Sequence, residues 1–357
     1  MKSENFSNAL LVWYDSAAAD LPWRRTRDPY HVWLSEIMLQ QTQVGTVIPY
    51  FERFINAFPT VTALAAAPLD QVLKRWEGLG YYSRARNLHR AAQRIVADHG
   101  GEFPSTAATL QTLPGIGRYT AGAIASIAFN EKVAVLDGNV MRVLTRLYDI
   151  ADDISLSATQ RRLWTLAELL VPADRPGDYN QAIMELGRTV CKPQNPACLM
   201  CPVSTHCLAY QHGTQNQRPV KAPKQPTPHY DVAAGVIWND TDQVLIAQRP
   251  AKGLLGGLWE FPGGKQEPGE SLPECLIREL REELAIHVEV GELLAVVKHA
   301  FTHFRITLHA FECRYLEGPP QALQCADWRW VSLDELDQFA FGRTDRRVID
   351  VLRSPIK

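Results

Sequence analysis

The spacing of apolar residues divides the chain into a helical first part and a second part rich in strands. In the first part, apolar residues recur at every third or fourth position, the period of a helix with one buried face. This spacing predicts helices in residues 5–21, 30–47, 106–113, 121–128, 140–144, 149–172 and 179–190. From Tyr230 onward, apolar runs predict strands at 232–238, 244–247, 296–297 and 306–311. We therefore expect an all-α domain followed by an α+β domain.

Residues 212–228 separate the two parts. They contain four prolines, two lysines, one arginine and no acidic residue, a composition typical of an extended linker. Such a basic segment could run along DNA, or it could be a plain spacer. The predicted domains are accordingly residues 1–211 and 229–357.

A chain of 357 residues, of which 46% are hydrophobic, is long enough for two or three folded domains. It shows no signal-peptide pattern and no apolar run of about 18 residues, so we expect a soluble cytoplasmic protein without a membrane partner. The formal net charge of −2 is unevenly divided. Residues 1–228 carry 23 Lys and Arg against 19 Asp and Glu, whereas residues 229–357 carry 14 against 20. The first part, at +4, is therefore the better candidate for a polyanionic partner than the second, at −6.

A short turn with two glycines, Gly115 and Gly117, connects two predicted helices. Without Cβ atoms, these glycines let the backbone approach another surface closely. A helix, a glycine hairpin and a second helix present free N–H groups where a DNA phosphate can bind, although an ordinary turn would show the same residues. Asp137, a lone acid in the apolar run 133–140, could likewise be only the N-cap of the next helix.

Four of the seven cysteines lie in residues 191–207, with the spacing Cys191-x6-Cys198-x2-Cys201-x5-Cys207. Four thiols without a matching set of histidines suit zinc or an iron–sulfur cluster. The other three cysteines are expected to be reduced thiols in a cytosolic protein.

The hairpin, residues 106–131, and Asp137 together resemble the endonuclease III superfamily of DNA repair glycosylases. Glu36–Val44, with three glutamines, and Trp76–Leu88, with two tyrosines, resemble the adenine DNA glycosylases of the MutY type. The resemblance implies a helix-hairpin-helix glycosylase domain with a six-helix lobe. It also implies that the four clustered cysteines hold a [4Fe–4S] cluster with a structural and DNA-docking role.

By this resemblance, Glu36 protonates the departing adenine, and Asp137 stabilises the sugar cation through a transient covalent bond. Tyr119 and Asn139 lie in the same active site. From residue type alone, Glu36 could instead be a solvated carboxylate on a helix surface. Breaking an N-glycosidic bond requires a proton on the leaving base and negative charge near the sugar, so two carboxyl groups with different pKa values suit the reaction. The target base must also leave the DNA stack.

Several residues are expected to contact DNA. By resemblance, Gln41 and Tyr82 enter the DNA helix near the lesion, although Tyr81, and less so Tyr82, could be core residues. Arginines on the following helix and the hairpin would hold the backbone. These predicted backbone contacts are Arg84, Arg86, Gly115, Gly117 and Arg118.

Tyr119 distinguishes two kinds of glycosylase. Related bifunctional enzymes carry a lysine at this position, which forms a Schiff base with the sugar. A phenol cannot form an iminium ion, so Tyr119 favours an enzyme that removes the base and leaves the strand intact.

The C-terminal domain resembles a Nudix hydrolase. The Nudix box spacing is met by Gly264, Glu270, Arg278, Glu279, Leu280, Glu282, Glu283 and Ile286, with Ala285 in place of a glycine. Glu279, Glu282 and Glu283 lie on one helix face and could hold Mg²⁺, or they could be a solvated acidic stripe in a domain that needs no Mg²⁺. In adenine glycosylases this domain reads 8-oxoguanine through a Phe-Ser-His loop, which Phe301-Thr302-His303 resembles.

The sequence thus predicts a monomeric, nucleoid-associated adenine DNA glycosylase. Its expected partner is duplex DNA with adenine opposite 8-oxoguanine, or opposite guanine as a weaker context. Two alternatives stay open: a bifunctional endonuclease III-like glycosylase/lyase, and a Nudix nucleotide pyrophosphohydrolase delivered to DNA by a helical module.

Overall fold

A computed structural model describes residues 3–223 and 226–354. The described residues form two compact units. The first unit lies within Met1–Ala66 and Asn87–Lys224, and the second lies within Ala67–Arg86 and Gln225–Lys357. Residues 67–86, predicted as part of the helical domain, thus fall in the second unit. The predicted domain limits remain a proposal, and two linker residues, Lys224 and Gln225, lie outside the described residues.

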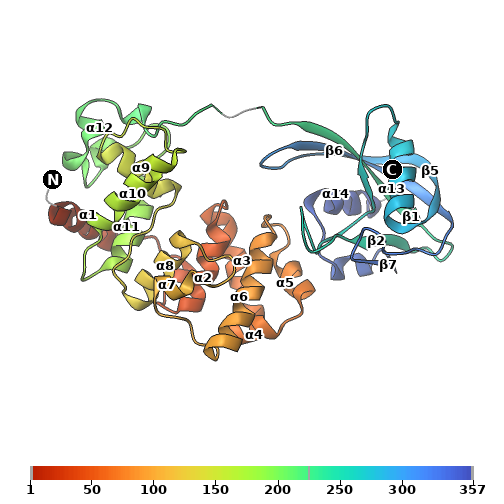
Figure 1. The fold of residues 1–357 in the computed structure, drawn as a ribbon, viewed down its shortest axis with the longest axis horizontal. Helices are drawn as coiled ribbons and strands as arrows, with labels where there is room; N and C mark the ends of the chain where they lie inside the picture. Colours follow the sequence, from red (N-terminus) through yellow and green to blue (C-terminus); the bar gives the residue numbers. More distant parts are fainter. Residues whose placement is uncertain (1–2, 224–225, 355–357) are drawn as a thin grey trace. The chain divides into compact units, whose positions relative to one another are not determined.

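The first unit is built from helices (Figure 1). Its α-helices are α1 Ser3–Ala17, α2 Pro29–Leu39, α3 Val44–Ala57, α4 Val61–Ala66, α7 Ala107–Leu110, α8 Arg118–Phe129, α9 Gly138–Leu147, α10 Ser157–Leu170, α11 Pro176–Thr189 and α12 Leu208–Gln211. Helix α6, Ser83–His99, spans the boundary between the units. Short 3-10 turns lie at Pro22–Arg24, Cys198–Met200, Ser204–His206 and Gln215–Gln217. Among the described residues, no helix combines the length and apolar character needed to cross a membrane.

The continuous helix predicted over residues 30–47 is wrong. Helix α2 starts at Pro29, with the Asp28 side chain accepting from the Tyr30 and His31 N–H groups, and ends at Leu39. Gln41 has a φ of 57°, in the left-handed region that a helix cannot contain. Because the apolar spacing continues into α3, periodicity could not show this break. The three glutamines therefore lie in a loop between two helices.

The predicted hairpin at residues 106–131 is confirmed. Thr106 caps α7 by accepting from the Thr109 N–H. Gly115 has a φ of +76°, and a Cβ there would lie 2.6 Å from the Asn87 Cβ. Only glycine avoids both the backbone strain and this overlap. Helix α8 follows at once and is buried from Thr120 to Ile127.

The second unit contains a seven-stranded sheet whose main path has the order β3-β2-β1-β6-β5, with β4 paired to β1 and β7 to β2. Strands β1 and β6 are parallel, and the other pairs are antiparallel. The strands are β1 His229–Trp238, β2 Val244–Gln248, β3 Trp259–Glu260, β4 Gly263–Lys265, β5 His287–Ala300, β6 Arg305–Glu317 and β7 Asp327–Val331. The helices are α5 Leu69–Trp76, α13 Leu272–Leu284, the 3-10 turn Glu335–Gln338 and α14 Arg343–Leu352.

Two apolar clusters form the core of the second unit. One cluster includes Val348 and Ile349 of α14, and the other includes Leu276 and Leu280 of α13. Alternate residues of β1 enter the two clusters, so the two helices cover opposite faces of the sheet. Ala285, where the Nudix box has glycine, ends α13 with a φ of 56°. This left-handed cap is a position that favours glycine, and alanine is strained there.

Candidate active site

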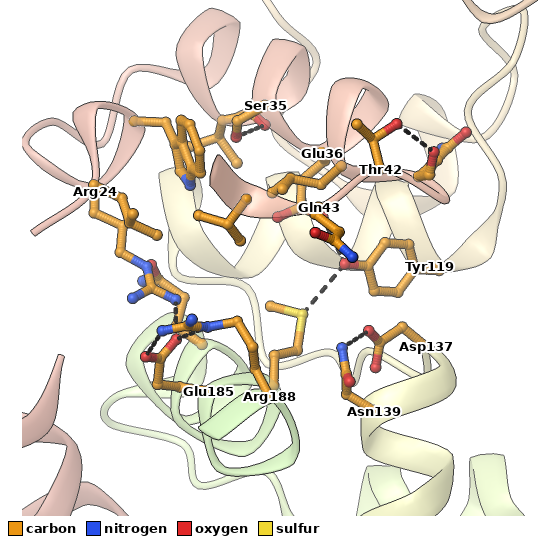
Figure 2. Close-up of a pocket in the computed structure, with 18 of the residues that line it drawn as sticks. Arg24, Ser35, Glu36, Thr42, Gln43, Tyr119, Asp137, Asn139, Glu185 and Arg188 are labelled. Atoms are coloured by element: carbon orange, nitrogen blue, oxygen red, sulfur yellow. Dashed lines mark hydrogen bonds and ion pairs between the residues drawn. The ribbon is translucent and has the colours of Figure 1, made fainter. Parts of the chain in front are cut away.

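A cavity of about 850 Å³ lies in the first unit (Figure 2). Its walls come from α2, the glutamine loop, the start of α8, the start of α9, and α11. Five residues predicted to act in catalysis or DNA contact line it: Glu36, Gln41, Tyr119, Asp137 and Asn139. The fold thus gathers residues from five separate stretches of sequence around one space, since Leu21, Trp23 and Arg24 also line it.

Glu36 projects from α2 and is only 7% exposed, so the interpretation as a solvated surface carboxylate is wrong. The Tyr119 hydroxyl donates a hydrogen bond of 2.5 Å to its Oε2 atom. Burial raises the pKa of Glu36 to about 7; the Tyr119 hydrogen bond opposes this rise, and the charge of Asp137 adds to it. A carboxyl group with this pKa is divided between protonated and ionised forms near neutral pH, as a general acid requires.

Tyr119 lies in the first turn of α8, directly after the hairpin. Its hydroxyl also lies 3.2 Å from the Met184 sulfur, the contact drawn as a dashed line in Figure 2. Burial, together with the charges of Glu36 and Asp137, raises the pKa of Tyr119 well above its usual value. The phenol therefore stays neutral and can act on Glu36 only as a hydrogen-bond donor.

Asp137 both caps α9 and lines the cavity, so the capping interpretation is confirmed and the catalytic one stays a prediction. Its Oδ1 accepts from the Val140 N–H at 2.7 Å, and its Oδ2 accepts from the Asn139 side chain at 2.8 Å. Burial raises the pKa of Asp137, while these hydrogen bonds act to lower it. The cap fixes the carboxylate at the positive end of the α9 dipole.

A chain of hydrogen bonds connects Asp137 to the cysteine segment. Arg142 donates to the Asn139 Oδ1 at 2.8 Å, and it donates to the Cys191 carbonyl at 2.7 Å. It also donates to the carbonyl of Gly187, where a Cβ would lie 2.6 Å from the Asn139 Cβ. Glycine at this position allows α11 to approach the cap closely.

Three charged residues that the sequence analysis did not predict also line the cavity. Glu185, on α11, is 2% exposed and accepts from Arg24 at 3.1 Å and from the Arg188 Nε at 3.1 Å. Burial acts to raise the pKa of Glu185, but the two guanidinium groups outweigh it and the pKa is lowered. Two features of the sequence could have pointed to these residues. One is the pair of arginines in Leu21–Arg25, and the other is the acidic residue on the apolar face of α11.

The predicted DNA contacts of the hairpin are exposed. Gly117 and Arg118 are open to solvent, and no atom lies within 4 Å of an added Cβ at Gly117. Arg118 forms a salt bridge with Glu168 and lies 3.9 Å from the centre of the Trp164 ring. Gln41 is also exposed at the cavity wall. Their contacts with DNA stay predictions.

The tyrosines of residues 76–88 reverse the expected pattern of burial. Tyr82 is 5% exposed, and its hydroxyl contacts the Gly78 N–H and the Phe341 carbonyl, whereas Tyr81 is 43% exposed. We expected Tyr81, more than Tyr82, to be a core residue, and this order is wrong. Tyr82 is the buried one because it fits between its own loop and Phe341. To insert into DNA, Tyr82 would first have to leave this buried position.

The two arginines that follow these tyrosines bind backbone carbonyls in the second unit. Arg84 donates to Leu79 and Gly80 of its own loop, at 3.3 and 3.1 Å. Arg86 donates to the Gly256 carbonyl at 2.5 Å. Arg84 is 9% exposed, so it shapes the loop rather than presenting a charge to a DNA backbone in this structure.

The segment Phe301-Thr302-His303 connects β5 and β6. Thr302 and His303 are exposed, whereas Phe301 packs between His299 and Phe304 with ring centres 4.6 and 4.7 Å away. The Thr302 hydroxyl lies 2.9 Å from the Tyr81 hydroxyl. Two polar side chains are thus presented on a loop held by an aromatic anchor.

All four cysteines of residues 191–207 line one small cavity of about 30 Å³. Arg146 donates to the Cys191 sulfur at 3.2 Å, and backbone N–H groups bond to the sulfurs of Cys201 and Cys207. Such donors suit thiolate sulfurs that ligate a metal centre. In residues 3–223 and 226–354, however, no three His, Cys, Asp or Glu side chains already stand close enough to hold a metal ion.

The three glutamates proposed for Mg²⁺ do not share one cavity. Glu279 and Glu283 line a cavity of about 420 Å³ in the second unit, but Glu282 does not. Arg278 forms salt bridges with Glu279 at 3.0 Å and with Glu282 at 3.5 Å. The sequence spacing predicted that all three glutamates lie on one helix face. In the structure, Arg278 forms ion pairs with two of them, Glu279 and Glu282.

Two family models match the chain. The model of the HhH-GPD superfamily of base excision DNA repair proteins matches residues 34–169, and that of the NUDIX domain matches residues 233–351. Adenine DNA glycosylase from Homo sapiens is 39% identical, an alignment that covers 97% of this chain and 73% of the human protein. The protein of the same name from Schizosaccharomyces pombe is 33% identical over 94% of this chain and 87% of its own length.

Solved structures show the same helical fold. A thermostable thymine-DNA glycosylase matches with a TM-score of 0.54 and 31% identity, over 59% of this chain and 97% of that chain. A non-covalent endonuclease III–DNA complex matches with a TM-score of 0.50 and 22% identity, over 60% and 99%. The predicted fold class, a helix-hairpin-helix glycosylase domain with a Nudix-like domain, is confirmed.

The pKa of Glu36 can be measured directly. We expect a side-chain carboxyl ¹³C NMR signal, absent from Glu36→Gln, to titrate near pH 7. Tyr119→Phe should raise this pKa further, by roughly one to two units, because a hydrogen bond to a charged group contributes about 1.5–3 kcal/mol. Tyr148→Phe, which alters a tyrosine outside the cavity, should leave it unchanged. Titration near the ordinary pKa of 4.5 would contradict the burial argument.

Proposed function

The chain belongs to the adenine DNA glycosylase family, and from this membership we propose that it removes adenine paired with 8-oxoguanine from duplex DNA. Adenine paired with guanine is the weaker second context, and the strand is left uncut. The observation that carries the proposal is the pair Glu36 and Asp137, two carboxyl groups in different surroundings at one cavity. The enzyme acts as a monomer in base excision repair.

The reaction begins when adenine leaves the base stack and enters the cavity. Glu36 then delivers its proton to a ring nitrogen of the base, and the electrons of the N-glycosidic bond move onto the leaving adenine. Burial supports this role, since it raises the pKa of Glu36 to about 7 and keeps a protonated fraction near neutral pH. The Tyr119 hydroxyl orients the carboxyl group.

Asp137 acts on the sugar. As the bond to adenine breaks, positive charge develops on the ring oxygen and C1′, and an Asp137 oxygen forms a bond to C1′. Water then displaces this carboxylate and completes the hydrolysis, with a proton passing back to Glu36. The α9 cap supports the role because it fixes the carboxylate before charge develops.

Glu185, Arg24 and Arg188 supply a polar wall for the base. A carboxylate accepts from an amino group such as N6 of adenine, and a guanidinium donates to a ring nitrogen such as N1. Glu185 is held between its two arginines, so its acceptors have a fixed direction. These three side chains therefore favour a base such as adenine, which presents a donor, N6, beside an acceptor, N1.

The cavity lining supports the proposal that the strand is left uncut. A lyase reaction needs an amine to form a Schiff base with the sugar. The described residues lining the cavity include no lysine, and Tyr119 occupies the position at the hairpin. These observations favour the monofunctional glycosylase over the glycosylase/lyase alternative.

Asp137→Asn should abolish excision and leave DNA binding largely intact, because the negative charge is needed only in the transition state. We expect at least a hundredfold lower single-turnover rate on a duplex with adenine opposite 8-oxoguanine, read after alkali treatment. Asp152→Asn, which alters an exposed aspartate, is the matched control and should act like the wild type. A rate within about tenfold of the wild type would remove Asp137 from the mechanism.

We also propose that Cys191, Cys198, Cys201 and Cys207 hold a [4Fe–4S] cluster. Their convergence on one cavity, and the Arg146 and backbone donors around their sulfurs, support it. When bound, such a cluster would fix the segment as a rigid DNA-docking element. Base hydrolysis transfers no net electrons, so the bond-breaking steps rest on the residues of the large cavity.

The cluster predicts a visible absorption band. Purified protein should be brown and absorb near about 400 nm, as iron–sulfur charge transfer does, and Cys198→Ser should lose this band. Cys325→Ser removes a thiol outside the segment and should keep it. One zinc and no iron by metal analysis would overturn the cluster.

The exposed loop at Thr302 supports a reading role for the second unit. Guanine has an acceptor at N7, whereas 8-oxoguanine has an N–H donor there, and a hydroxyl oxygen can accept from that donor. The alternative, a nucleotide pyrophosphohydrolase, would need Mg²⁺ at glutamates of which two are bound by Arg278. Release of adenine from duplex DNA in the presence of EDTA would favour the glycosylase over this metal-dependent hydrolase.

Thr302→Ala should lose part of the preference for 8-oxoguanine over guanine. One base contact contributes about 1–3 kcal/mol, so the ratio of excision rates should fall by roughly ten to a hundredfold. Thr302→Ser keeps the hydroxyl and should retain the preference, as should Thr241→Ala, which alters an exposed threonine of the β1–β2 turn. An unchanged ratio in Thr302→Ala would exclude this hydroxyl as the reader.

A further inference from the structure

A groove of about 750 Å³ lies between β5 and α14 in the second unit. Its apolar lining comes from residues 294–297 of β5, and its polar lining comes largely from α14. Strand β5 is at the end of the main sheet path. Among the described lining residues, the groove shares only Thr344 with the cavity that contains Glu279 and Glu283.

Three cations line this groove. Arg343 and Arg347 are one helix turn apart on the exposed face of α14, and Lys298 is exposed on β5. None of the three forms a salt bridge with any acidic residue in the described part of the chain. Asp350 is the single acidic side chain in the described lining, so the groove keeps a net positive charge.

This arrangement differs from the rest of the unit. Most of its other arginines are neutralised by carboxylates, namely Arg249, Arg278, Arg314, Arg329, Arg346 and Arg353. Residues 229–357 carry a net charge of −6. A cluster of free cations on an acidic background can steer an anion to one place.

The groove also adjoins the loop proposed to read the base. Its lining runs along β5 to Ala300, and Phe301 follows directly. His299, in the same lining, contacts the Phe301 ring with centres 4.6 Å apart. A DNA strand whose base meets Thr302 would therefore bring neighbouring phosphates toward these cations.

We propose that the β5–α14 groove binds backbone phosphates of the DNA strand beside the base read by the Phe301–His303 loop. This inference rests on the proposed function. Arg343 and Arg347 are spaced by about 6 Å along the helix axis, so their two guanidinium groups can each contact a different phosphate of one strand. The first turn of α14, where Arg343 lies, adds the partial positive charge of a helix N-terminus.

The test is the salt dependence of DNA binding. All proteins carry Asp137→Asn to stop excision, and binding to a duplex with adenine opposite 8-oxoguanine is measured between 50 and 200 mM NaCl. Each phosphate contact contributes about 0.9 to the slope of log K against log salt. Arg343→Gln/Arg347→Gln should therefore reduce the slope by about 1.8, and Lys298→Gln by about 0.9.

A matched control separates a local contact from a change of net charge. Arg281→Gln/Arg314→Gln removes two exposed arginines from α13 and β6, and its slope should equal that of the Asp137→Asn protein. Equal slopes in the groove variant and this control would overturn the proposal and leave the groove to another partner, such as an acidic peptide. Excision by protein with Asp137 intact is assayed separately, so failure of the glycosylase function would be recognised independently.

Discussion

The hydrogen bond between Tyr119 and Glu36 is the contact on which the site depends. A buried carboxyl group is stable in a protein only when it is neutral or has a partner. Here the partner comes from the first turn of α8, and the carboxyl comes from the buried face of α2. The packing of these two helices therefore determines the protonation of Glu36. Any change that separates them would expose the carboxyl group and lower its pKa toward the ordinary value.

Asp137 belongs to a chain of hydrogen bonds that extends from the cavity to the cysteine segment. Its Oδ1 caps α9 and its Oδ2 is held by Asn139, which is in turn held by Arg142. Because Arg142 also binds the Cys191 carbonyl, the order of the cysteine segment is coupled to the direction of the Asp137 side chain. A metal centre in that segment could thus support catalysis through position alone.

The sequence predicted the parts of the fold that follow from local rules, and it missed those that depend on tertiary contacts. The hairpin was predictable because Gly115 has a conformation that other residues adopt poorly. The break at Gln41 was not, because its apolar neighbours keep helical spacing on both sides. Glu36, Tyr119, Asp137 and Asn139 were found by resemblance and meet at one cavity. Glu185 and Arg188 were missed because no periodicity records ion pairing, and ion pairing is what allows Glu185 to be buried.

The second unit shows that the spacing of a motif does not fix the chemistry of its residues. Glu270, Glu279 and Glu282 keep the spacing of a metal-binding box, yet one guanidinium, that of Arg278, forms salt bridges with all three. Burial raises the pKa of Glu283 to about 7, so this carboxyl group is partly protonated near neutral pH and is a weaker ligand for a hard cation. The acidic residues of this motif are thus neutralised in two ways, by ion pairs with Arg278 and by partial protonation of Glu283. Both leave them poorly suited to binding Mg²⁺.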